Sequence, residues 1–167
     1  MLFNIFVDKI TKVFDQSCDP VTINNIPQNC LLWSDDLLLF STSAKGLQNS
    51  IDKMCLFYAS LGLDISLKKT KVIIFNKSGK LLKGFTFLCN GTELEITSEY
   101  QYLGIKFTPS GSLALATDEL SAKASRAWFS ISNLVYTNKR MPVQRAIELF
   151  DSLVTPVALY ASEFWLP

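Results

Sequence analysis

Two adjacent carboxylates, Asp35 and Asp36, stand between two short apolar runs of the sequence. Each run has the length of a β-strand, and Asp is frequent in tight turns, so the pattern predicts a hairpin with the acidic pair at its tip. A divalent cation relieves the repulsion between two like charges, and Mg²⁺ prefers carboxylate oxygens as ligands. The residues alone therefore leave two interpretations open, a metal-binding turn for phosphoryl transfer and a solvated turn.

The composition sets limits on the class of protein. A chain of 167 residues fits a single domain of ordinary size, and its net charge of +1 says nothing about partners. Hydrophobic residues make up 49% and charged residues 19%, which suggests that some apolar surface normally meets another domain. No run of about twenty apolar residues exists, so the sequence predicts no membrane span.

The cysteines and the absence of histidine exclude several kinds of site. The four cysteines form no C-x-x-C pair and there is no histidine, which argues against structural zinc. Without histidine, a Ser-His or Cys-His nucleophile pair is excluded. Free thiols in an intracellular protein are the simplest interpretation.

The hydrophobic periodicity predicts a body of mixed helix and strand followed by a helical tail. We expect Ser43 to cap a helix that Gly62 ends, Asn90-Gly91 to turn a hairpin, and Pro142 to begin a helix. Trp128 and Phe129 are expected in the core of the tail. The predicted helices are 1–14, 44–61, 113–135 and one from 142, and the predicted strands flank the acidic pair and cover 72–75, 85–88, 93–96 and 100–107.

Five motifs follow one another in a specific order along nearly the whole chain. They are Leu2–Phe6, Trp33-Ser34-Asp35-Asp36, Gly62–Lys71, Tyr102–Ile105, and the pair Leu149–Pro156 with Tyr160–Trp165. In this order they resemble the palm and thumb of reverse transcriptases from non-LTR (LINE-like) retrotransposons. The fold class implied is α+β: a partial polymerase palm over 1–109, an antiparallel sheet with helices on one face that includes the primer grip, and an all-helical thumb over 110–167.

The resemblance implies an RNA-directed DNA polymerase, that is, Mg²⁺-dependent nucleotidyl transfer on an RNA template with a DNA primer. Asp35 and Asp36 would be the catalytic carboxylates and metal ligands, and Lys69 the general acid that protonates the pyrophosphate leaving group. The remaining implied contacts are to nucleic acid, from Tyr102, Leu103, Gly104, Lys68 and Lys71. Lysines run from 68 to 83 with no acid between Ile65 and Thr92, which fits phosphate contact or simple solubility.

The sequence also departs from the family pattern. Trp33 stands where Tyr or Phe is usual, and Ser66 where Asn is usual. The chain begins after the strand that would carry a third carboxylate and after the fingers, yet two-metal catalysis needs carboxylates from two elements. We therefore expect an isolated chain that is inactive without those parts. A non-catalytic nucleic-acid-binding module and a degenerate remnant of an element are the alternatives.

Overall fold

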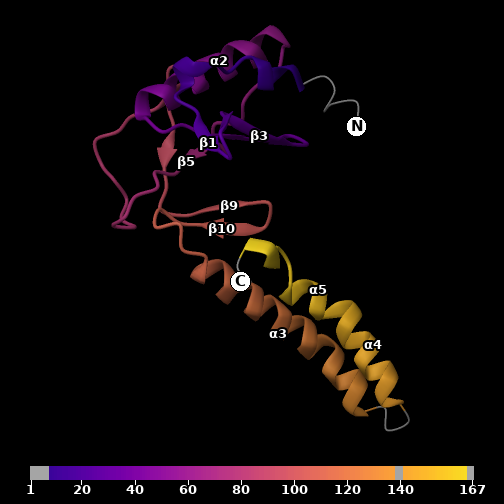
Figure 1. Cartoon of the computed structure of the whole chain (residues 1–167). Helices are drawn as coiled ribbons and strands as arrows, with labels where there is room; N and C mark the ends of the chain where they lie inside the picture. The colour runs from indigo at the N-terminus through magenta and orange to yellow at the C-terminus, as the bar shows by residue number, and fades with distance from the viewer. Residues whose placement is uncertain (1–7, 138–140, 165–167) are drawn as a thin grey trace. The chain divides into compact units, whose positions relative to one another are not determined.

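The structure is a computed structural model that describes residues 8–137 and 141–164 (Figure 1). The chain divides into two compact units, and each is described by itself. Unit 1 contains the residues up to Val72 together with Leu82–Thr97, and unit 2 contains Ile73–Leu81 together with the residues from Ser98. The chain therefore leaves unit 1, contributes a short segment to unit 2, and returns.

Unit 1 contains one long helix and a series of short strands. Antiparallel pairs join β1 to β2, β3 to β4 and β6 to β7, and β5 pairs with β8 in parallel. The elements are η1 (Asp8–Lys12), η2 (Gln16–Cys18), β1 (Val21–Ile23), β2 (Ile26–Gln28), β3 (Cys30–Trp33), β4 (Asp36–Leu39), α2 (Ala44–Ser60), β5 (Lys71–Val72), β6 (Leu88–Cys89), β7 (Thr92–Glu93) and β8 (Glu95–Ile96).

The ends of α2 are defined by local chemistry. The Ser43 hydroxyl accepts a hydrogen bond of 2.9 Å from the Gly46 N–H, as an N-cap does. At the other end Gly62 adopts a φ of 68°, and the amide of Leu63 reaches back to the Tyr58 carbonyl at 2.9 Å. This is the Schellman arrangement, and it satisfies carbonyls that the helix itself leaves unpaired.

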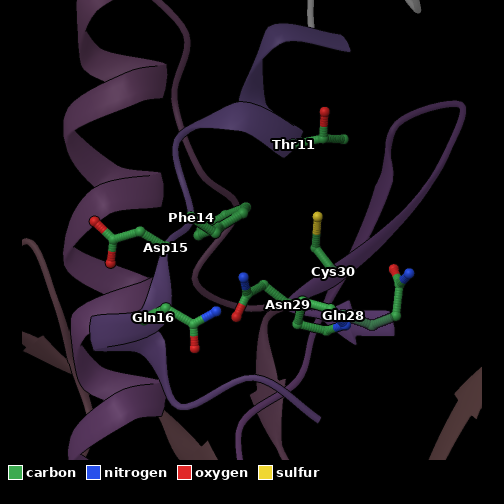
Figure 2. Close-up of a pocket in the computed structure, with 8 residues that line it drawn as sticks. Thr11, Phe14, Asp15, Gln16, Gln28, Asn29 and Cys30 are labelled. Carbon is green, nitrogen blue, oxygen red and sulfur yellow. The ribbon is translucent and has the colours of Figure 1, made fainter. Parts of the chain in front are cut away.

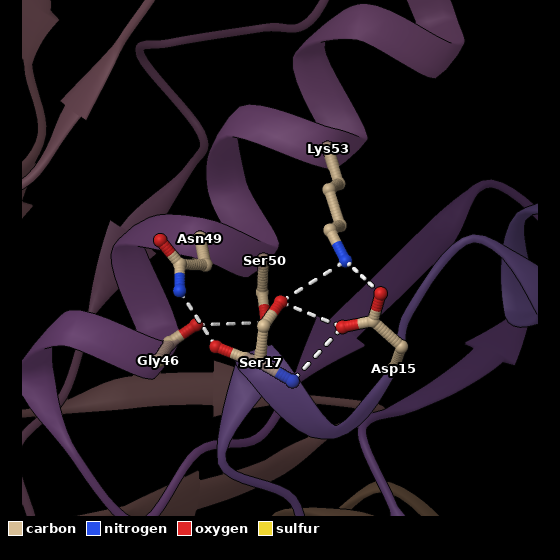
Figure 3. Close-up of polar contacts among 6 residues, drawn as sticks. All are labelled: Asp15, Ser17, Gly46, Asn49, Ser50 and Lys53. Carbon is tan, nitrogen blue, oxygen red and sulfur yellow. Dashed lines mark hydrogen bonds and ion pairs between the residues drawn. The ribbon is translucent and has the colours of Figure 1, made fainter.

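The segment before β1 is held on α2 by a polar network (Figure 3). The Lys53 ammonium lies 2.6 Å from the Asp15 carboxylate and donates to the Ser17 hydroxyl at 3.2 Å. The Asn49 amide donates to the Ser17 carbonyl at 2.6 Å. Because Asn49 and Lys53 are one helical turn apart, both side chains lie on one face of α2 and reach the same η2 turn.

At Gly46 the backbone of the η2 segment lies directly against α2. A Cβ at this position would lie 2.6 Å from the Cys18 carbonyl oxygen, 2.6 Å from the Asp19 Cβ and 2.5 Å from the Ser41 Oγ. Such distances are shorter than any ordinary van der Waals contact, so only glycine allows this approach.

The same place joins the two ends of the segment that carries β1–β4. The Thr42 amide donates to the Asp19 carbonyl at 2.9 Å, and the Ser41 hydroxyl donates to the Cys18 carbonyl at 2.8 Å. The Ser43 hydroxyl also hydrogen-bonds the Asp19 carboxylate. Residues 20–41 therefore leave and return at one point beside the N-terminus of α2. We call this point, formed by Cys18, Asp19, Ser41, Thr42 and Gly46, the α2 anchor.

Unit 2 is a hairpin followed by helices. Strands β9 (Tyr100–Tyr102) and β10 (Ile105–Phe107) pair antiparallel, and α3 (Ala114–Thr137) runs beside α4 (Val143–Leu153) and α5 (Thr155–Ala158), before η3 (Ser162–Phe164) (Figure 1). The first half of α3 buries Ala116 and Leu120 against Ile105. Its second half packs Ala124 and Ile131 against Val154. One apolar stripe on α3 thus holds both the hairpin and the last helices.

Several sequence predictions are confirmed. Helix 44–61 is α2, the tail helices are α3 and α4, and Asn90 and Gly91 both take positive φ in the turn between β6 and β7. Trp128 is packed in the helical core, with its ring 5.7 Å from that of Phe150. Within the described ranges, no helix is long and apolar enough to span a membrane.

Other predictions are wrong in detail. Phe129 is 70% exposed, so it does not belong to the core. The strand expected over 72–75 shortens to β5, and the single strand expected over 100–107 is the β9–β10 hairpin. Of the helix predicted over 1–14, residues 1–7 lie outside the described residues, and η1 is a short 3₁₀ turn. The palm and thumb assignments to 1–109 and 110–167 remain predictions.

Substitution of Gly46 tests the α2 anchor. Gly→Ala inside a helix normally stabilises by about 1 kcal/mol, but here the added methyl meets backbone at the anchor. We expect Gly46→Ala to destabilise unit 1 by about 1–3 kcal/mol, measured as the shift in the urea unfolding curve. The exposed neighbour Lys45→Ala is the matched control and should change stability by less than about 0.5 kcal/mol. A stabilised Gly46→Ala variant would contradict the close approach.

The Asp15–Lys53 pair predicts a dependence of stability on pH. The hydrogen bond from Lys53, followed by those from Ser17, lowers the pKa of Asp15 from 3.8 to about 2. A depressed folded-state pKa means that the carboxylate stabilises the fold above pH 3.8, and that this contribution is lost as the pH falls through about 2.

Asp15→Asn removes the charge but keeps the side-chain oxygen that caps η2. We expect the difference in urea midpoint between the natural chain and Asp15→Asn to be largest near neutral pH and to fall towards zero below about pH 2. A difference that stays constant over this range would show that the charge of Asp15 is not what holds the η2 turn.

Candidate functional site

The acidic pair lies at the tip of the β3–β4 hairpin, as predicted. Trp33 pairs with Asp36 in the register, so Ser34 and Asp35 are the two turn residues and Asp36 is the first residue of β4. Ser34 has a φ of 55° and Asp35 does not have a positive φ, which is the pattern of a type II′ turn. Such a turn matches the twist of the strands, so the tip is a continuation of a regular ladder. We call this element the Asp hairpin.

The two faces of the Asp hairpin differ. Residues opposite each other in the ladder share a face, so Trp33 and Asp36 lie on one face with Leu31. Trp33 is 66% exposed and Leu31 is 50% exposed, whereas Leu32 and Leu37 on the other face are half-buried. Asp36 therefore stands beside a large exposed aromatic ring.

Asp35 and Asp36 are both exposed, and neither forms a side-chain hydrogen bond or ion pair with any other described residue. Two adjacent carboxylates with this freedom are a suitable donor set for Mg²⁺, which binds oxygen ligands and keeps several waters. In the part of the chain that the structure describes, no group of three or more Asp, Glu or Cys side chains could hold a metal. The Asp hairpin thus supplies two carboxylates and no further protein ligand from this part.

The base of the Asp hairpin rests on α2. Burial raises the pKa of the Cys30 thiol at the start of β3. It also raises the pKa of Tyr58 on α2, with a smaller contribution from the charge of Cys30. Both side chains are half-buried, and the α2 anchor holds the two ends of residues 20–41.

A cavity of about 490 Å³ lies at this base and not at the tip (Figure 2). Its lining comes from the η1–η2 segment and from the β2–β3 junction, including Asp15, Asn29 and Cys30. The Asn29 Oδ1 is buried and has no hydrogen-bond partner among the described residues. Neither Asp35 nor Asp36 lines this cavity, so it is distinct from the acidic pair.

The predicted basic residues of unit 1 lie on a tight turn and on the strand that follows it. The Ser66 carbonyl accepts hydrogen bonds of 3.0 Å from the amides of Lys69 and Thr70, and these two bonds fix the turn. Lys68 and Lys69 are exposed. Lys71 lies in β5, and its ammonium is paired with the Glu95 carboxylate on the neighbouring strand β8. The charge of Lys71 is therefore already partly neutralised.

The Tyr102-Leu103-Gly104 motif forms the tip of the β9–β10 hairpin, where a single strand was predicted. Leu103 and Gly104 have φ of 45° and 81°, the pattern of a type I′ turn. The turn residues are Leu-Gly and not the Asn-Gly or Asp-Gly pair typical of such a turn, so the sequence offers little indication of a hairpin here. Gly104 tolerates the positive φ without cost, and Leu103 needs support from its surroundings.

Tyr160 supplies that support, a role that the sequence analysis did not assign. Its hydroxyl donates to the Leu103 carbonyl at 2.7 Å. A Cβ on Gly104 would lie 3.3 Å from the Tyr160 ring, so the ring covers the turn closely. Lys106 further ties the hairpin to α3 through Glu119 at 2.6 Å, and this hydrogen bond raises the pKa of Lys106 and lowers that of Glu119.

Comparison with known proteins decides the family. Residues 1–107, more than half of the chain, match the family described as reverse transcriptase (RNA-dependent DNA polymerase). The chain belongs to the reverse transcriptase family. No solved structure matches it.

Two of the similar proteins come from retrotransposable elements, and a third is described as transposon-derived. The chain is 29% identical over 118 residues, 66% of its length, to the Pol polyprotein of the type-2 element R2DM of Drosophila melanogaster. It is 32% identical over 97 residues, 53% of its length, to the Pol polyprotein of the type-1 element R2 of Bradysia coprophila. It is 28% identical over 140 residues, 81% of its length, to a putative transposon-derived protein of Caenorhabditis elegans.

The chain spans 11% of the length of each polyprotein and 48% of the Caenorhabditis elegans protein. The predicted resemblance to a non-LTR retrotransposon reverse transcriptase is confirmed. Reverse transcriptases use divalent metal ions and bind a nucleic acid template and primer. The roles of individual residues in this chain remain predictions.

Removal of the Tyr160 hydroxyl tests the support of the Leu103-Gly104 turn. Tyr160→Phe loses the hydrogen bond to the Leu103 carbonyl, and we expect a loss of about 0.5–1.5 kcal/mol in the stability of unit 2, measured by urea unfolding. Tyr136→Phe is the matched control, since Tyr136 is 73% exposed, and it should be close to neutral. Equal effects of the two substitutions would contradict a specific role for Tyr160.

Proposed function

We propose that this chain supplies the metal-binding hairpin and part of the template–primer contacts of an RNA-directed DNA polymerase from a non-LTR retrotransposon. The observation that carries the proposal is the Asp hairpin: two exposed carboxylates without partners among the described residues, at the tip of a regular ladder, in a chain of the reverse transcriptase family. Asp35 and Asp36 are the proposed ligands of Mg²⁺. The bound ion would supply Lewis-acid stabilisation of the charge on the reacting phosphoryl group.

The chain's own residues would then position the reactants. Asp36 is fixed by its place in β4, and Asp35 by the turn, so both carboxylates are held without a flexible loop. Trp33 lies beside Asp36 on the exposed face and offers an apolar surface against which a nucleotide base could stack. A rigid element with a stacking surface would hold the nucleotide in the orientation that the reaction needs.

Lys69 is the proposed general acid for the pyrophosphate leaving group. It lies on the Ser66–Thr70 turn, exposed next to Lys68, and both ammonium groups are suited to phosphate oxygens. Lys71 should contribute less to binding phosphate than the resemblance implies, because its ammonium is paired with Glu95. The Leu103-Gly104 turn, covered by Tyr160, is the proposed contact with the primer end.

We further propose that the isolated chain does not polymerise. Two-metal phosphoryl transfer needs carboxylates from two separate elements, which together hold two ions about 4 Å apart. The Asp hairpin is one such element, and among the described residues no cluster of three or more Asp, Glu or Cys side chains extends it. The proposed partner of the Asp hairpin is a further polymerase segment that brings another carboxylate to the tip.

Cation binding at the Asp hairpin is testable with Mn²⁺, a paramagnetic substitute for Mg²⁺. In NMR spectra of the full chain, we expect low concentrations of Mn²⁺ to broaden the amide signals of Asp35, Asp36 and Leu37 first. The double substitution Asp35→Asn with Asp36→Asn should weaken this effect at least about tenfold, since it removes both charges. Asp118→Asn, which removes an exposed carboxylate from α3, is the control and should leave it unchanged.

Primer extension on an RNA template tests whether the chain is a polymerase part that needs a further segment, a polymerase active by itself or a non-catalytic binding module. The isolated chain should incorporate no nucleotide, and addition of the remaining polymerase segments should give synthesis that depends on Asp35. Incorporation by the chain alone, abolished in Asp35→Asn, would overturn the proposed dependence on a partner. Steeply salt-dependent duplex binding without metal broadening at the hairpin would favour a non-catalytic binding module instead.

A further inference from the structure

Two buried thiols of unit 1 face each other. The Sγ atoms of Cys55 on α2 and Cys89 on β6 are 2.7 Å apart. Cys89 is fully buried and Cys55 is 6% exposed. The sulfur–sulfur bond of a disulfide is about 2.05 Å long, so the two atoms are within about 1 Å of bonding distance.

Independent contacts hold the backbones on which the two thiols stand. The Gln48 side chain receives a hydrogen bond of 2.9 Å from the Leu88 amide and donates one of 2.8 Å to the Leu88 carbonyl. Gln48 precedes Cys55 by two helical turns on the same face of α2, and Leu88 directly precedes Cys89. The Asn90-Gly91 turn fixes the other side of Cys89. The approach of the two sulfurs is thus set by the fold and does not depend on their own contact.

The other two cysteines differ from this pair. Cys18 is a buried residue of the α2 anchor, and Cys30 is half-buried at the base of the Asp hairpin. Among the described residues, neither is in hydrogen-bond contact with another sulfur. Burial, followed by the hydrogen bond and charge of the neighbouring Cys55, raises the pKa of the Cys89 thiol to about 12, so thiol–disulfide exchange at Cys89 is slow in the folded chain.

We propose that Cys55 and Cys89 form a reversible intramolecular disulfide when the chain meets a low-molecular-weight disulfide such as oxidised glutathione. The Cys55 thiolate, the more accessible of the two, attacks the reagent, forms a mixed disulfide and releases one small thiol. The Cys89 thiolate then attacks the Cys55 Sγ and releases the second small thiol. Two electrons and two protons pass from the protein to the reagent, so the step is balanced.

The crosslink would secure the segment that returns to unit 1. The chain leaves this unit after Val72 and comes back at Leu82, and Phe87, Cys89 and Leu94 are the buried residues of the returning part. A bond from Cys89 to α2 closes the loop between them and limits the unfolded chain more than the folded one. Oxidation should therefore stabilise the attachment of residues 82–97 to the helix that also carries the α2 anchor. This inference does not depend on the proposed polymerase role.

The test uses the reduced full chain in buffers of graded reduced and oxidised glutathione. Each sample is brought to equilibrium, once under native conditions and once after unfolding and refolding in the same buffer. Free thiols are then blocked with an alkylating reagent, and the chain is cleaved and mapped by mass spectrometry. We expect a peptide pair linked through Cys55 and Cys89 to appear at a lower proportion of oxidised glutathione than any modification of Cys18 or Cys30.

Two variants complete the experiment. Cys30→Ser, at a half-buried thiol outside the pair, should leave the linked peptide unchanged, and Cys89→Ser should abolish it and leave Cys55 alkylated or bound to glutathione. The oxidised chain should unfold at a higher urea concentration than the reduced chain, and a reducing agent should reverse the shift. Alkylation of both Cys55 and Cys89 after both treatments, or a crosslink to Cys18 or Cys30 in preference, would overturn the proposal.

Discussion

The close approach of the Cys18–Asp19 backbone to Gly46 is the contact on which the arrangement of unit 1 depends. It brings the start and the end of residues 20–41 to one point, where the Thr42 amide and the Ser41 hydroxyl bond the carbonyls of Asp19 and Cys18. The Asp hairpin extends from this point, and its Phe40 amide bonds the Asn29 carbonyl at 2.7 Å. The position of the acidic pair is therefore decided at the N-terminus of α2 and not at the turn itself.

The local elements were predictable because their causes are local. Ser43 and Gly62 mark the ends of α2 by capping chemistry, Asn90-Gly91 supplies the positive φ of a hairpin turn, and an acidic pair between apolar runs indicates a turn. The Leu103-Gly104 turn was missed because Leu rarely takes a positive φ without help, and that help comes from Tyr160, more than fifty residues later in the chain. Phe129 was predicted in the core but is exposed, because α3 buries one stripe of side chains and Phe129 lies outside it.

The candidate site shows the same division between local and distant causes. That Asp35 and Asp36 share a hairpin tip follows from their neighbours in the sequence, but the pairing of Lys71 with Glu95 arises from the parallel β5–β8 ladder, which no local pattern announces. Gly46 lies inside the predicted helix 44–61, and the helical pattern does not show that the backbone packed on it requires glycine. Contacts between distant segments thus account for most of what the sequence did not reveal.

Native-state hydrogen exchange measures the dependence of the Asp hairpin on the α2 anchor most directly. The Thr42 amide reports the anchor and the Phe40 amide reports the base of the hairpin. If the anchor holds the hairpin, both amides exchange through one opening with the same free energy and the same dependence on urea, and Gly46→Ala accelerates both equally. Exchange of the Phe40 amide through a separate opening of lower free energy, while the Thr42 amide stays protected, would contradict this account.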